Sequence, residues 1–90
     1  MPQLVVNPEE LAKFALNLRD FTEHLRQNMH RLNGQFTQLR ETWRDQEQQK
    51  FAQEYMDMMK SIERFLNTSD QHIPFLLRKA ERAREYQHQK

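Results

Sequence analysis

The sequence predicts an all-α fold, an antiparallel helical hairpin that pairs with a second hairpin as a four-helix bundle dimer. Three observations carry this prediction. Apolar residues recur at steps of three and four along most of the chain, which is the period of an amphipathic helix. No segment shows the alternation expected of a strand. The 90 residues suffice for one small domain, residues 1–90. They hold one glycine, Gly34, so they supply no glycine-dependent hairpin turns.

The first helix is expected over about residues 8–40. Asn7 offers an N-cap, Pro8 suits the first helical position, and Glu10 stands at the third. Gly34 lies inside this helix at a cost of about 1 kcal/mol relative to alanine, and it either permits a close helix approach or is merely tolerated. The helix carries an apolar stripe with one extra four-residue step near its middle: Leu11, Phe14, Leu18, Phe21, Leu25, Met29, Leu32, Phe36, Leu39 and Trp43.

A turn is expected at about residues 41–45, followed by a second helix over about residues 46–66. Either Thr42 or Asp45 can cap this helix, because both side chains accept hydrogen bonds from N–H groups of a first helical turn. The second helix carries its own stripe at steps of four and three: Phe51, Tyr55, Met58, Ile62 and Phe65.

The chain after this second stripe contains a proline, Pro74. A proline inside a helix removes one backbone hydrogen bond and disfavours helix at the residue before it. We therefore expect a kink or a short break over residues 67–73. The helical period then resumes, which predicts a last helical stretch over about residues 74–87.

A lone hairpin of this size cannot enclose both stripes. Two arrangements solve this problem: the last segment folds back to make a three-helix bundle, or two hairpins pair as a four-helix bundle. We favour pairing, because small domains are commonly stabilised by oligomerisation. The partner is then a second copy or a related helical hairpin, and the residues of the two stripes are the candidates for core and interface.

The turn region also carries a motif. Leu39, Trp43 and Phe51 have the spacing L-x-x-x-W-x-(G)-x-x-x-x-x-F, with Asp45 in place of the glycine. This pattern resembles the W-x-G family of small helical hairpins, which includes the early-secreted-antigen-like proteins of type VII secretion. The resemblance implies a dimeric hairpin that serves as a secreted substrate or accessory of such a system. It also implies a link of Trp43 to the secretion machinery and partner helices, although a bundle-end core position is the alternative.

The sequence departs from the family in a second place. The family's Y-x-x-x-D/E export signal is missing, because Tyr86 is followed four residues later by Lys90. This departure leaves a second function open, a cytoplasmic coiled-coil adaptor or structural subunit unrelated to secretion.

Several function classes are not expected. The chain has no cysteine, no two of its histidines stand four residues apart, and no nucleophile stands in a catalytic motif, so we expect no enzyme activity, metal or cofactor. The basic residues near the C-terminus alternate with acidic ones, which does not favour nucleic acid as a partner. No apolar run is long enough for membrane insertion. The first residues lack a signal-peptide pattern, so we expect synthesis in the cytoplasm and any export to proceed without a cleavable signal peptide.

Overall fold

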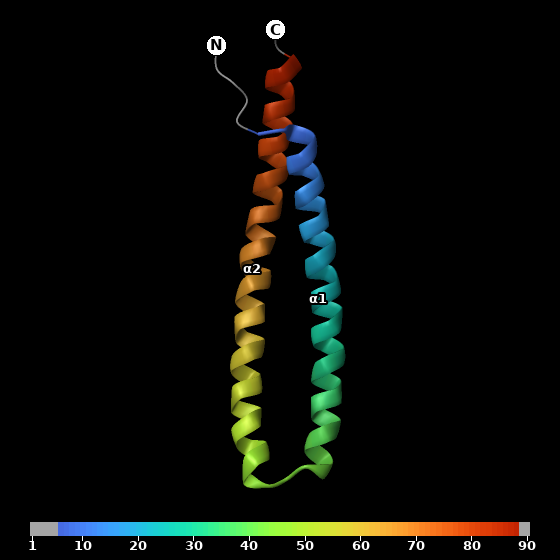
Figure 1. Ribbon diagram of the computed structural model, residues 1–90, viewed down its shortest axis with the longest axis vertical. Coiled ribbons are helices and arrows are strands. Elements are labelled where there is room, and N and C mark those ends of the chain that lie inside the picture. Colours follow the sequence, from blue (N-terminus) through green and yellow to red (C-terminus); the bar gives the residue numbers. More distant parts are fainter. Residues whose placement is uncertain (1–5, 89–90) are drawn as a thin grey trace.

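A computed structural model describes residues 6–88 as two long helices joined by a short turn. Helix α1 spans Pro8–Thr42 and helix α2 spans Gln46–His88. The helices lie side by side and run in opposite directions, with the turn at one end of the molecule and both chain ends at the other (Figure 1). The predicted all-α antiparallel hairpin is therefore confirmed.

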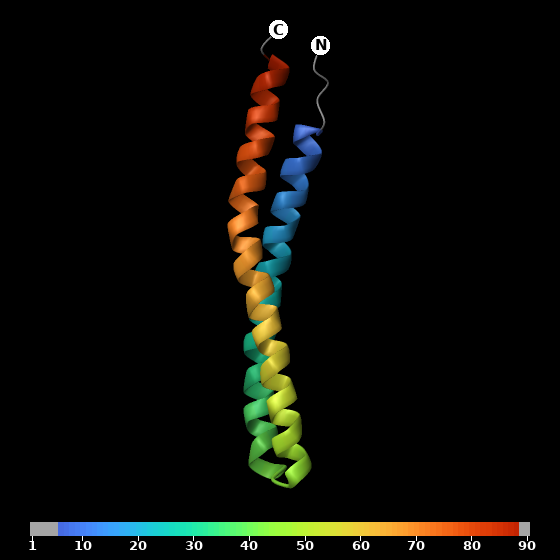
Figure 2. The same ribbon diagram turned by 90° about the vertical axis from the view of Figure 1, so that its left-hand side faces the viewer.

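The hairpin is elongated. Its extents are 69 × 18 × 14 Å, and its radius of gyration is 20.2 Å, compared with about 12 Å for a compact domain of this length. Figure 2 shows that the two helices cross as they run along each other. The last part of α2 continues beside the start of α1 and extends beyond it (Figure 1). The last segment therefore does not fold back, and the three-helix alternative does not apply.

Both helix starts are capped by side chains. Asn7 Oδ1 accepts hydrogen bonds from the N–H groups of Glu9 and Glu10, at 2.9 and 3.1 Å. At the start of α2, the N–H of Gln48 donates to Asp45 Oδ1 at 3.1 Å. The hydroxyl of Thr42 instead donates back to a carbonyl of α1. Asp45 is therefore the cap of α2, which decides between the two caps that the sequence left open.

Helix α2 does not break over residues 67–73 and continues through Pro74. The proline leaves the carbonyl of Asp70 without its helical N–H partner. Both residues are exposed, so water can take the place of the missing donor. About 100° round α2 from these two residues, Ser69 and Ile73 are each only 5% exposed. Their packing in the hairpin favours continuous helix over the local preference of the proline.

The two helices pack through a seam of buried residues. Those of α1 recur at a strict seven-residue spacing, which is the repeat of helices that wind around each other. They are Pro8, Ala15, Thr22, Met29 and Phe36. Those of α2 are Gln48, Tyr55, Met59, Leu66, Ser69, Ile73, Ala80 and Ala83.

The seam differs between the two halves of the hairpin. In the turn half, large side chains form one core cluster: Met29, Phe36, Tyr55, Met59 and Leu66. In the open half, nearer the chain ends, the seam holds mainly small residues, among them Ala15, Ala80 and Ala83. Burial of a large apolar side chain contributes about 1.5–3 kcal/mol, so the turn half provides most of the hairpin's own hydrophobic stabilisation.

Gly34 lies on an open surface of α1. No atom lies within 4 Å of the position that a Cβ would take, so the glycine does not serve a close helix approach. We expect Gly34→Ala to raise the free energy of unfolding by about 0.5–1 kcal/mol, because alanine costs less backbone entropy in a helix. Urea denaturation at one protein concentration measures the change. The exposed control Gln38→Ala should change it by less than about 0.5 kcal/mol. Destabilisation by Gly34→Ala would contradict this account.

Candidate functional site: an exposed apolar face

Large hydrophobic side chains lie exposed in rows along the hairpin. Within each row the residues are seven apart, so they stay on one side of their helix. We call this set the apolar face, and its members are 37–59% exposed. They are Phe14, Phe21, Leu32 and Leu39 of α1, and Phe51, Met58 and Phe65 of α2.

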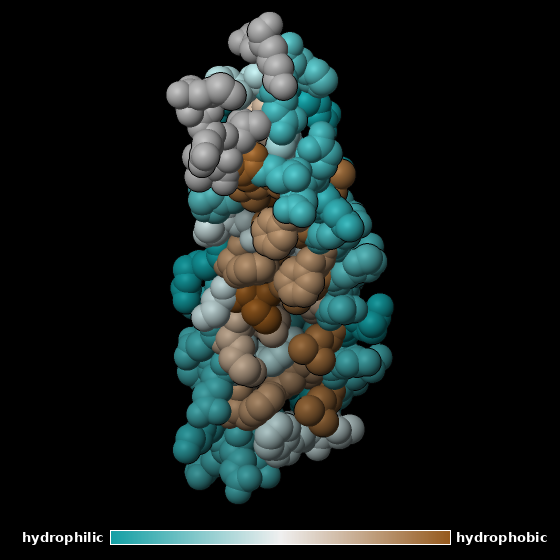
Figure 3. Space-filling view, turned by 45° about the horizontal axis from the view of Figure 1, so that its top comes forward, coloured by the Kyte–Doolittle hydropathy of each residue, from teal (hydrophilic) through white to brown (hydrophobic). Residues whose placement is uncertain are grey.

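Contacts between the helices place these rows on one side of the hairpin. The rings of Phe21 and Phe65 meet edge to face, with their centroids 6.1 Å apart. Nearer the turn, Leu32 and Leu39 line the same groove as Met58. Figure 3 shows the result, a hydrophobic band that runs over both helices between hydrophilic borders. The apolar face is therefore one continuous surface.

The turn half of this surface is hollowed into a groove of about 560 Å³. The rings of Phe36 and Tyr55 lie in its lining with centroids 4.4 Å apart, and the ring of Phe51 lies 5.8 Å from that of Phe36. The Tyr55 hydroxyl is satisfied, because it donates to Asn33 Oδ1. Gln35 contributes the one amide side chain of the lining, and the remaining side chains are aliphatic, aromatic or, in two methionines, thioethers. Such a groove favours an apolar occupant over water.

The other side of the hairpin is polar. Viewed along the axis of α1, Arg26 lies about 40° from the buried Thr22 in one direction, and Phe21 lies about 100° from Thr22 in the opposite direction. On that polar side, Arg26 forms an ion pair with Asp70 of α2. Their side chains are 43% and 50% exposed, so the pair contributes at most about 1 kcal/mol. The hairpin thus presents two chemically different sides.

The structure sorts the predicted core and interface residues into three groups. Met29, Phe36 and Tyr55 are buried between the helices. A second group is half-buried at the edge of the seam: Leu11, Leu18, Leu25 and Ile62. The remaining residues make up the apolar face, and their part in an interface stays a prediction.

Two buried positions of the seam cannot be predicted from large apolar residues, because small residues occupy them. Ala15 and Thr22 are 0% and 1% exposed, whereas the neighbouring Phe14 and Phe21 are 59% and 56% exposed. Both buried positions lie at seven-residue steps before Met29, so a seven-residue repeat counted from Met29 would have predicted them. The irregular step in the predicted stripe arises because it combines the buried row with part of the apolar face.

Trp43 is the C-cap of α1 and lies half-buried at the turn. Its N–H donates to the carbonyl of Leu39 at 2.9 Å, and its ring centroid lies 5.9 Å from that of Phe51. The indole therefore packs beside the apolar face while part of it stays accessible. A role of Trp43 in recognition stays a prediction.

Asp45 fits the turn without conformational strain. Among residues 6–88 no residue has a positive φ, so the backbone here does not require glycine. The aspartate instead supplies the cap of α2, which a glycine cannot do with a side chain. The chain thus departs from the W-x-G pattern at a position where the departure is structurally compatible.

Removal of this cap gives a testable change in stability. We expect Asp45→Ala to lower the free energy of unfolding by about 1 kcal/mol and Asp45→Gly to lower it by only a few tenths. Chemical denaturation measures both variants. Asn7→Ala at the other cap is the matched control and should cost about 1 kcal/mol as well. Wild-type stability of Asp45→Ala would rule out capping by this carboxylate.

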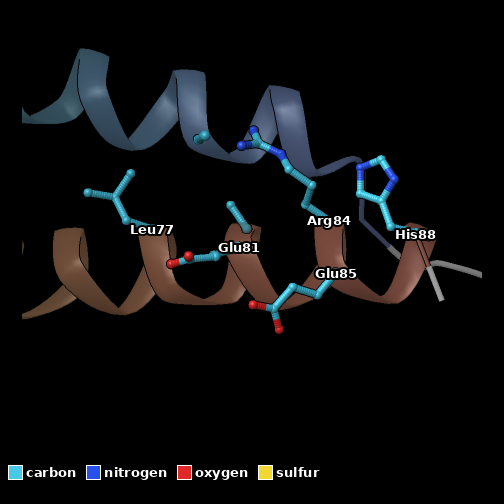
Figure 4. A pocket seen from close by; sticks show the side chains of 7 residues that line it. Leu77, Glu81, Arg84, Glu85 and His88 are labelled. Carbon is cyan, nitrogen blue, oxygen red and sulfur yellow. The ribbon is translucent and has the colours of Figure 1, made fainter.

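A second hollow lies at the open end, between the first turns of α1 and the last turns of α2 (Figure 4). The side chain of Arg84 reaches toward α1, where its Nε lies 3.9 Å from the Glu9 carboxylate. Glu85 points away from α1, while Leu77 points toward it (Figure 4). Acidic, basic and apolar groups mix around this hollow, so it lacks the uniform chemistry of the apolar groove.

Two other kinds of site are absent from the part of the chain that the structure describes. Histidine and acidic side chains form no cluster there that could hold a metal ion. Neither helix has a stretch long and apolar enough to span a bilayer. The apolar face is therefore the principal candidate for function.

Comparison with known families adds an independent observation. Residues 3–86 match the WXG100 family model, described as proteins of 100 residues with WXG. The chain belongs to the WXG100 family. Neither a search of curated proteins nor a search of solved structures returned a match.

WXG100 membership agrees with the architecture and with the turn. Trp43 supplies the tryptophan of the motif, and Asp45 replaces its glycine. WXG100 proteins are small helical proteins of the kind that type VII secretion systems export, and they are not enzymes. They commonly form helical-hairpin dimers.

Proposed function

We propose that this protein is a non-enzymatic interaction protein that acts as a dimer, as a secreted substrate or accessory of a type VII-like secretion system. The apolar face is the observation that carries the proposal. Its rows of phenylalanine, leucine and methionine run along the hairpin, where each Å² removed from water contributes about 25 cal/mol. Large apolar surfaces of this kind mark interaction sites.

The total exposed area supports a partner. The chain exposes 7516 Å², whereas a compact monomer of 11.1 kDa exposes about 5,700 Å². The surplus of about 1,900 Å² is more than twice the roughly 800 Å² that each partner buries in a standard interface. A second hairpin laid along the apolar face completes a four-helix bundle and covers this surface.

Each part of the hairpin has a task in this proposal. The apolar face binds the partner hairpin, and the turn with Trp43 contacts the secretion machinery. No cofactor, metal or nucleic acid takes part, and the protein does not insert into membranes.

Export is tested by fractionation of the native host. We expect the protein in the culture medium while a cytoplasmic marker stays in the cells, and we expect its loss from the medium when the type VII system is inactivated. Retention in the cells of both strains would contradict the secretion role and favour a cytoplasmic adaptor. The missing acidic residue four positions after Tyr86 makes this test informative.

Docking through the apolar face is tested by methionine oxidation. Met58 and Met56 are 49% and 50% exposed, but they lie about 200° apart round α2, and Met58 lines the groove. We expect hydrogen peroxide to oxidise Met58 several-fold more slowly than Met56 in the dimer, and equally fast in a folded variant that does not dimerise, such as Phe21→Asp. Peptide mass spectrometry measures both rates. Equal rates in the associated protein would place the interface elsewhere.

A further inference from the structure

Asn33 and Gly34 form the one Asn-Gly pair of the chain. We infer that Asn33 is a modification site: its side-chain amide deamidates spontaneously to aspartate and isoaspartate when the turn half of the hairpin opens, and the closed hairpin suppresses the reaction. The inference concerns a single chain, so it depends neither on a partner nor on the proposed function. It rests on the chemistry of this residue pair and on the contacts that hold the pair inside α1.

The reaction consumes one water and releases one ammonia. The backbone nitrogen of Gly34 attacks Cγ of Asn33, so a new C–N bond forms while the C–N bond of the side-chain amide breaks. The attacking nitrogen gives up its proton, the amide nitrogen leaves as ammonia, and a five-membered cyclic imide remains. Water then opens the imide at either carbonyl. Cleavage at Cγ gives aspartate, whereas cleavage at the backbone carbonyl gives isoaspartate, in which the main chain runs through the side chain.

The glycine sets this asparagine apart from the others. Glycine has no Cβ, so no side chain crowds the attacking nitrogen, and its backbone reaches conformations that other residues avoid. Asn28 lies in the same helix but precedes Met29, whose side chain hinders the same ring closure. Asn7 precedes a proline, which has no N–H proton to give up. The remaining asparagines also precede residues with side chains, so deamidation is fastest at Asn33.

The closed hairpin restrains both reacting groups. Asn33 and Gly34 lie inside α1, where the N–H of Gly34 donates to the carbonyl four residues earlier. The ring cannot close in this geometry, because it needs the backbone of Asn33 rotated out of the helical region. The side chain is held as well, since Asn33 Oδ1 accepts a hydrogen bond from the Tyr55 hydroxyl of α2. Tyr55 is only 7% exposed and belongs to the core cluster, so the amide is tied to the core of the turn half.

Opening of the turn half removes both restraints together. Asn33 and Gly34 are exposed to water, and no atom lies within 4 Å of the position that a Cβ of Gly34 would take. No packed neighbour therefore shields the pair once α1 unwinds. The rate then follows the population of the open state, so an opening that costs at least about 1.4 kcal/mol slows the reaction at least about tenfold.

The two products affect the hairpin differently. Asn33 stands between Met29 and Phe36, which are both buried in the core cluster. Aspartate leaves the main chain unchanged and offers a carboxylate oxygen to the Tyr55 hydroxyl. Isoaspartate lengthens the main chain by one carbon, which interrupts the helical hydrogen bonds and shifts Phe36 out of step with Met29. A chain that forms isoaspartate while open therefore loses the packing of its turn half.

Incubation of the full chain at mildly alkaline pH tests the inference. One sample stays native, a second is unfolded in guanidinium chloride, and peptide mass spectrometry follows the conversion of each asparagine. We expect Asn33 to deamidate at least about tenfold faster in the unfolded sample. Asn28 is the matched control, because it is also exposed in α1, and it should react much more slowly than Asn33 when unfolded.

Two results would overturn the inference. Equal rates at Asn33 in the native and unfolded samples would show that the closed hairpin does not suppress the reaction. Equal rates at Asn33 and Asn28 in the unfolded samples would show that the Asn-Gly pair is not a preferred site.

Two variants separate the chemistry of the pair from its effect on the fold. In guanidinium chloride Gly34→Ala should slow the conversion of Asn33 several-fold, and an unchanged rate would overturn the role of the glycine. After removal of the denaturant, helix content by circular dichroism should fall in proportion to the isoaspartate formed. Asn33→Asp carries the aspartate product and should refold to wild-type helix content. Full recovery of helix in a sample rich in isoaspartate would overturn the effect assigned to that product.

Discussion

Replacement of Phe21 by aspartate is expected to convert the dimer into folded monomers. The ring of Phe21 packs on Phe65 at the apolar face and is 56% exposed in the single hairpin, so the hairpin tolerates a charge there. In the dimer the same position is covered, and an unpaired buried carboxylate costs several kcal/mol. We expect the dissociation constant to rise at least about a hundredfold, which corresponds to about 2.7 kcal/mol.

Sedimentation equilibrium measures this constant, and circular dichroism shows whether the helices persist. The control is Leu16→Asp, which introduces the same charge about 140° round α1 from Phe21. The control should remain dimeric with unchanged helix content. If Leu16→Asp dissociates the protein as strongly as Phe21→Asp, the apolar face is not the interface.

Replacement of Phe36 by alanine is expected to destabilise the hairpin itself, by about 3–4 kcal/mol. Phe36 is 9% exposed, and its ring packs on Phe51 and Tyr55 within the core cluster. The guanidinium of Arg40 also lies over the ring, 5.7 Å from its centroid. Alanine would lose these contacts and leave a cavity at the centre of the turn half. Urea denaturation at matched protein concentrations measures the loss.

Met56→Ala is the control for this experiment. Met56 is 50% exposed and lies away from the core, so its truncation should cost less than about 1 kcal/mol. A loss in Phe36→Ala no larger than that of the control would contradict the placement of the core. The two large effects differ in kind, because Phe36→Ala weakens each hairpin and Phe21→Asp separates hairpins that remain folded.

Much of the fold could be predicted from local signals. Asn7 and Pro8 mark the start of α1, and the capping bond of Asp45 agrees with one of the two predicted starts of α2. The apolar period predicted the two helices, and the short turn between them predicted that they run antiparallel. These features depend on neighbouring residues in the chain, which is why a single sequence contains them.

Other features depend on contacts that a stripe of apolar residues does not specify. A kink or a short break over residues 67–73 was expected from local preference. The break does not occur, because Ser69 and Ile73 are buried in the hairpin and the helix continues. The predicted apolar stripe also did not separate the buried seam residues of α1 from the exposed residues of the apolar face. Small residues such as Ala15 allow the inner contact, while the more hydrophobic Phe14 faces outward. Residue size and hydropathy alone therefore assign this pair to the wrong rows.

The candidate site followed the same pattern. The sequence predicted which residues are apolar enough for an interface, and all seven residues of the apolar face belong to the two predicted stripes. It could not predict the groove, because the groove arises from the packing of Phe36, Tyr55 and Phe51 across the two helices.

Light scattering after size exclusion shows whether the apolar face joins two hairpins. We expect a mass of twice 11.1 kDa that stays constant over a dilution series, and a mass of 11.1 kDa for Phe21→Asp with its helix content preserved. A wild-type chain that elutes as a folded monomer of 11.1 kDa at every concentration would show that the apolar face does not join two copies.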